Sequence, residues 1–82
     1  QFMYYQEECE AKAARRRILR ASDELRLGIE HSHEYFNDVL DDISFYDSFC
    51  NEHPNFKNMQ AVAAINFVTE KYQECLKENK FL

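Results

Sequence analysis

Glycine, proline and tryptophan are scarce in this chain of 82 residues, which contains one Gly, one Pro and no Trp. Tight turns depend on Gly and Pro, so their scarcity argues against an all-β fold. No apolar run approaches the roughly 18 residues needed to span a bilayer, and no segment resembles a signal peptide. We therefore expect an all-α fold without a membrane span.

Motifs of enzymatic chemistry are also lacking. The sequence has no glycine-rich phosphate loop and no nucleophile motif. Asp41 and Asp42 are adjacent, so on a helix they point in different directions and cannot share a proton. We expect no catalytic residues, no cofactor-binding residues and no enzymatic activity.

Metal ligands are poorly placed. Cys50 and His53 form a C-x-x-H pair, but zinc needs four ligands that converge on one point. His31 and His33 would point about 200° apart on a helix of 3.6 residues per turn. We expect no metal site.

The three cysteines, Cys9, Cys50 and Cys75, cannot all pair within one chain. An odd number without regular spacing indicates reduced thiols, so we expect an intracellular protein of the cytoplasm or nucleus. The chain begins at Gln1 rather than Met, which we interpret as a segment of a larger protein.

Basic side chains are absent from the middle of the chain. Residues 29–54 hold seven acidic residues and no Lys or Arg. Four of the acids recur at helical spacing, as on a solvated face or on a surface for a Lys/Arg-rich partner.

Arg15, Arg16, Arg17 and Arg20 are interleaved with acids in a chain of net charge −5, so we do not expect nucleic-acid binding. Consecutive aromatic residues cannot all be buried on one side of a helix, and some of them could line a groove for a partner. The candidate partner surface comprises Glu30, Glu34, Asp38, Asp41, Tyr35, Phe45 and Phe49.

What the chain does contain is a long apolar stripe. Hydrophobic residues make up 45% of the sequence, which is typical of an ordered domain. Alternate steps of three and four residues connect Ile18, Ser22, Leu25, Ile29, Ser32, Phe36, Val39, Ile43, Tyr46 and Cys50. This average spacing of 3.5 residues is that of helices packed against helices. The predicted self-association seam comprises Ile18, Leu25, Ile29, Phe36, Val39 and Ile43.

Gly28 leaves two architectures open. Because the stripe keeps its phase across Gly28, we predict one helix over about residues 2–51, a turn over about 52–55 at Pro54, and an antiparallel returning helix over about 56–79. Folding about Pro54 would pair positions whose numbers sum to about 108, such as Phe36 with Tyr72. Alternatively, the helix ends at Gly28 and Ser32 caps a second helix, which gives a compact three-helix bundle. That fold would place the arginines at 15–17 near Asp42 and Asp47.

Each architecture implies a function. The long hairpin would leave its first half uncovered, so it predicts a homodimer: a four-helix bundle with a coiled-coil extension that acts as a non-enzymatic scaffold. The three-helix alternative predicts a monomeric adaptor domain that binds a basic or amphipathic helical peptide of another protein. Both interpretations make this single module a site of protein–protein interaction.

Overall fold

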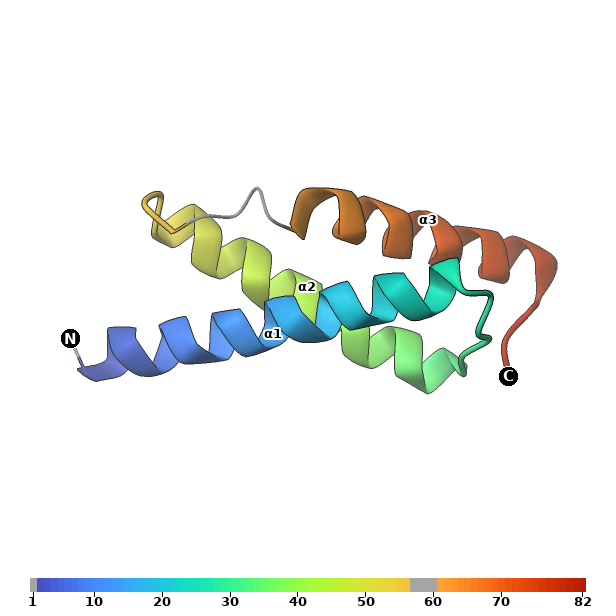
Figure 1. Cartoon of the computed structure of the whole chain (residues 1–82), viewed down its shortest axis with the longest axis horizontal. Coiled ribbons are helices and arrows are strands. Elements are labelled where there is room, and N and C mark those ends of the chain that lie inside the picture. The colour runs from blue at the N-terminus through green and yellow to red at the C-terminus, as the bar shows by residue number, and fades with distance from the viewer. Residues whose placement is uncertain (1, 57–60) are drawn as a thin grey trace.

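Three helices form the fold in a computed structural model that describes residues 2–56 and 61–82. They are α1 (Phe2–Arg26), α2 (His33–Glu52) and α3 (Val62–Glu78). α2 runs back across α1, and α3 then runs in the same direction as α1 (Figure 1). α1 packs against both other helices, whereas α2 and α3 contact each other little. The result is an elongated bundle with extents of 44 × 21 × 19 Å.

The predicted continuous helix across Gly28 is wrong. Gly28 has a φ of +84°, a left-handed conformation that ends helices and favours glycine. Its N–H donates to the carbonyl of Leu25, and the N–H of Ile29 donates to the carbonyl of Glu24. These two bonds form the Schellman motif, which satisfies carbonyls at the end of α1.

The second helix begins as the alternative interpretation predicts. Ser32 is the N-cap of α2, and its Oγ accepts a hydrogen bond of 3.1 Å from the backbone N–H of Tyr35. The compact three-helix bundle therefore fits the structure. A long hairpin with an uncovered first half does not.

The segment that contains Pro54 separates α2 from α3. α2 ends at Glu52, close to the predicted turn, but α3 begins only at Val62. Residues 53–56 are not helical, and the predicted helical residues 57–60 lie outside the described part of the chain. The predicted pairing of α2 with α3 holds at Phe36 and Tyr72, whose ring centroids lie 5.4 Å apart.

The core lies between α1 and the other two helices. Small residues of α1, Ala11, Ala14 and Ala21, are buried there, so neighbouring helices can approach closely. The largest fully buried side chains are Tyr46, Phe36, Ile18 and Val68. After α3, the backbone N–H of Leu82 donates to the carbonyl of His31, and the Phe81 ring packs on His33 with centroids 4.6 Å apart. The last residues thus hold the α1–α2 loop against α3.

Candidate functional site between α1 and α2

Five of the six predicted seam residues lie in the core of the single chain. They are Ile18, Leu25, Phe36, Val39 and Ile43, all buried by contacts within the bundle. Ile29 lies in the α1–α2 loop and is 45% exposed. The chain's own helices cover these five residues.

The predicted partner surface divides into exposed and buried residues. Glu34, Asp38, Asp41 and Phe45 are exposed, and their spacing of four, three and four residues places them along one face of α2. Phe45 is 37% exposed, which is substantial for an aromatic side chain within a helix. We call these four residues the acidic face of α2.

The other three predicted surface residues lie elsewhere. Phe49 is only 3% exposed and packs against Phe56, with ring centroids 4.9 Å apart. Tyr35 is half-buried, and its ring stacks on His31 at 3.7 Å. Glu30 is exposed in the loop, beside a cleft that faces α3. Phe49 therefore belongs to the core rather than to a binding surface.

Two shallow clefts run along the line where α1 meets α2. The first is lined by Arg17, Arg20, Glu24, Tyr35, Asp38, Val39 and Asp42. The second is lined by Glu10, Ala13, Arg17, Asp42 and Phe45. Both share Arg17 and Asp42, and neither includes a described residue of α3. The two clefts lie on either side of the Arg17–Asp42 pair, and we call them together the α1–α2 groove.

Helical periodicity explains why these residues line a single groove. On α1 the lining residues fall at positions 10, 13, 17, 20 and 24, and on α2 they include positions 35, 38, 42 and 45. Steps of three and four keep each set on one face of its helix. The α1 residues of this groove are absent from the predicted site. Their signal in the sequence was the same three-and-four spacing, and the three-helix alternative already placed Arg17 near Asp42.

A charge pair bridges the middle of the groove. The guanidinium of Arg17 donates two hydrogen bonds to Asp42, with Nε–Oδ2 and Nη2–Oδ1 distances of 2.8 and 2.9 Å. The hydrogen bond to Asp42 raises the pKa of Arg17. The Arg17 side chain remains 60% exposed and that of Asp42 is 19% exposed. Such a bidentate pair fixes the register of the two helices more than it stabilises them, because solvent screens exposed charges.

A polar cluster closes one end of the groove. The Glu24 carboxylate accepts hydrogen bonds of 3.3 Å from the Tyr35 hydroxyl and from Arg20 Nε. His31 Nε2 lies 2.9 Å from Glu24 Oε1, but the two groups lack the alignment of a hydrogen bond. Burial, and then the charge of Glu24, raises the pKa of Tyr35. The cluster ties the α1–α2 loop to both helices.

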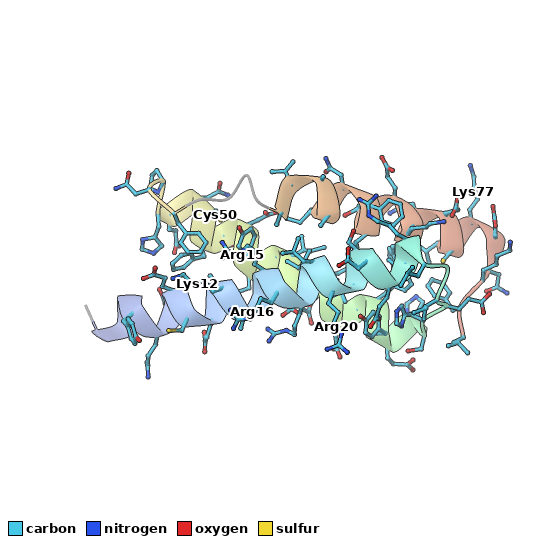
Figure 2. The ribbon with its side chains drawn as sticks, in the orientation of Figure 1. Lys12, Arg15, Arg16, Arg20, Cys50 and Lys77 are labelled. Carbon is cyan, nitrogen blue, oxygen red and sulfur yellow. The ribbon has the colours of Figure 1, made fainter. Side chains whose placement is uncertain are left out.

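The two edges of the groove carry opposite charge. Arg16 and Arg20 project from the same side of α1, away from α3 (Figure 2). On α2, Glu34, Asp38 and Asp41 are exposed along one face of the helix, and Asp38 lines the groove. We call these two sets the basic rim and the acidic rim.

The remaining sequence candidates, Cys50 and Arg15 among them, do not line the groove. Among residues 2–56 and 61–82, no group of three His, Cys, Asp or Glu side chains is placed to hold a metal ion. Burial raises the pKa of the Cys50 thiol, which makes it less reactive. Arg15 lies over the Phe56 ring at 5.7 Å, so it does not extend the basic rim.

Comparisons with known proteins give no assignment. The chain matches no protein-family model, no curated protein and no solved structure. None of the three described helices combines the length and apolarity needed to cross a membrane.

Proposed function

We propose that this domain is a monomeric adaptor, and that its α1–α2 groove binds an amphipathic helix with basic residues from another protein. One observation carries the proposal: Phe45 lies partly exposed in a groove that α3 leaves open, on a helix face that is otherwise acidic. A bound helix would complete a four-helix arrangement around α1 and α2.

The chemistry of the groove defines the partner. Val39 provides apolar surface in one cleft of the groove, and Ala13 and Phe45 provide the apolar floor of the other. Residues 29–54 contain no Lys or Arg, so a basic partner meets no repulsion from α2. Apolar residues at helical spacing would contact the floor, and Lys or Arg beside them would contact Asp38 and Asp41. An intracellular location is part of the proposal, because the free thiols Cys9, Cys50 and Cys75 are typical of reducing compartments.

Five of the six predicted seam residues are buried within one chain, which argues against self-association through that seam. Static light scattering over a range of concentrations tests this point. We expect the mass of one chain, 9.9 kDa, throughout. A mass that doubles with concentration would instead favour a second copy as the occupant of the groove.

Peptide binding tests the proposal directly. The probe is a fluorescent 21-residue helical peptide with a Leu/Ala seam and Lys beside it, and binding is measured by anisotropy. We expect Asp38→Asn with Asp41→Asn to weaken binding about tenfold, because each exposed charge contact contributes up to about 1 kcal/mol. The matched control is Glu70→Gln with Glu78→Gln on α3, which changes the net charge equally. Equal weakening by both pairs would show that only net charge matters and would refute the groove.

A second pair of variants isolates the apolar contact. Phe45→Ala removes the aromatic side chain from the groove, and Leu76→Ala removes an apolar side chain of similar exposure from α3. We expect only Phe45→Ala to weaken peptide binding, by about tenfold or more, as aromatic anchors commonly do. Unchanged binding by Phe45→Ala would place the peptide elsewhere.

A further inference from the structure

Opposite charges on the two rims constrain the bound helix further. Arg16, Arg17 and Arg20 lie on the α1 side, and the side chains of Arg17 and Arg20 are 60% and 80% exposed. Glu34, Asp38 and Asp41 lie on the α2 side and are all exposed. A helix lying in the groove therefore has a basic neighbour along one flank and an acidic neighbour along the other.

The acids of α1 offset part of the charge on its basic rim. Glu24 forms an ion pair of 3.3 Å with Arg20 Nε, and Asp23 is exposed three residues after Arg20. Glu10 lies at the other end of the groove, beyond Ala13. Arg17 keeps an exposed face even though it is bonded to Asp42. Arg16, Arg17 and Arg20 outnumber Asp23 and Glu24 on the central stretch of α1, so this side of the groove keeps a net positive charge.

From this asymmetry we infer that the partner is an amphipathic helix with Lys or Arg along one flank of its apolar seam and Glu or Asp along the other. This inference rests on the proposed function. It adds that the α1–α2 groove selects the arrangement of charge and not only its sign. A partner helix with bases on both flanks would meet like charges at Arg16 and Arg20, which disfavours it.

The charged rims also set the direction in which the bound helix runs along the groove. The two flanks of a helix exchange sides when the helix is reversed in the groove. For a given partner, only one direction places its bases on the acidic rim and its acids on the basic rim. The opposite direction creates repulsion along both rims. The rims therefore fix the polarity of the bound helix.

Two synthetic peptides test the inference. Both have 21 residues and the same Leu/Ala seam; one carries Lys on both flanks, and the other carries Lys on one flank and Glu on the other. Anisotropy titrations at low salt give their affinities for the wild-type chain. We expect the Lys/Glu peptide to bind about tenfold more tightly, because several exposed charge contacts change from repulsive to attractive.

Charge reversal on the rim supplies the decisive variant. Arg16→Glu with Arg20→Glu should invert the preference, so that the Lys/Lys peptide binds more tightly. Lys77→Glu with Lys80→Glu on α3 and the following segment changes the net charge equally and should leave the preference as in wild type. Circular dichroism verifies that both variants remain helical.

The possible results separate the inference from the proposed function. Tighter binding of the Lys/Lys peptide to wild type, or an unchanged preference in Arg16→Glu with Arg20→Glu, would overturn the inference and leave the groove as a binding site. Absence of binding by both peptides at millimolar concentration would overturn the proposed function and the inference with it.

Discussion

Gly28 offers the sharpest test of the three-helix fold. Its φ of +84° lies in the left-handed region, where a residue with a side chain is strained by about 1–2 kcal/mol. A Cβ at this position would meet no atom within 4 Å, so Gly28→Ala adds no steric clash. Alanine also reduces the freedom of the unfolded chain, which recovers about 0.4–1 kcal/mol. The expected net loss of stability is therefore about 1 kcal/mol.

Thermal unfolding followed by circular dichroism measures this loss. A domain of 60–100 residues should lose about 4–8 °C in Tm for each 1 kcal/mol. Gly28→Asn is the matched control, since asparagine tolerates the left-handed conformation best among residues with side chains. The chain itself uses Asn79 at φ 56° in the corresponding position after α3. We expect Gly28→Asn to lose less stability than Gly28→Ala.

The opposite result would refute the reasoning. If residue 28 continued a helix, alanine would be favoured over glycine by about 1 kcal/mol. Gly28→Ala would then raise Tm, and an extended first helix would expose its apolar face and double the mass in light scattering. A higher Tm together with a doubled mass would favour the long helical hairpin over the three-helix fold.

Four further predictions concern the cap, the core and the titrating side chains. Ser32→Ala should cost about 1 kcal/mol in chemical unfolding, because it removes the cap of α2, and no loss would disprove the cap. Phe36→Asp should abolish the helical circular dichroism signal by burying a charge; a folded variant would place Phe36 at the surface. Iodoacetamide should modify exposed Cys9 in the folded protein and buried Cys50 only in denaturant, as seen by mass spectrometry. Because folding raises the pKa of Tyr35, the unfolded chain ionises first, so stability should fall above about pH 10. Tyr35→Phe should reduce that fall in urea titrations at pH 9 and 11.

Local chemistry made much of the fold predictable. The helix-forming composition and the scarcity of Gly and Pro gave the all-α class, and Pro54 marked the region where α2 ends. In the three-helix alternative, Ser32 was predicted as the cap of α2 and Arg17 was predicted to lie near Asp42, and both are confirmed. These features depend on neighbours in sequence or on the geometry of one reversal.

The choice between the two architectures failed for a physical reason. Leu25 and Phe36 face the same core from opposite sides of a short loop, so the stripe keeps its phase although the backbone reverses. Periodicity identifies which face of a helix is buried, but not which chain supplies the covering surface. Ile29 fell on the stripe by spacing alone and lies exposed in the loop.

The groove depends on contacts that helical periodicity does not contain. Phe45 and Phe49 are one turn apart on α2 and look equivalent in the sequence, yet Phe49 is buried and Phe45 is partly exposed. The difference arises after α2 ends, where the hydrogen bond from the Phe56 N–H to the His53 carbonyl forms a turn that brings the Phe56 ring onto Phe49. Phe45 lies farther from that turn and toward the open side of α1, so no described segment covers it as Phe56 covers Phe49. The position of Phe56 thus distinguishes Phe45 from Phe49, and no described residue of α3 reaches the groove in which Phe45 lies.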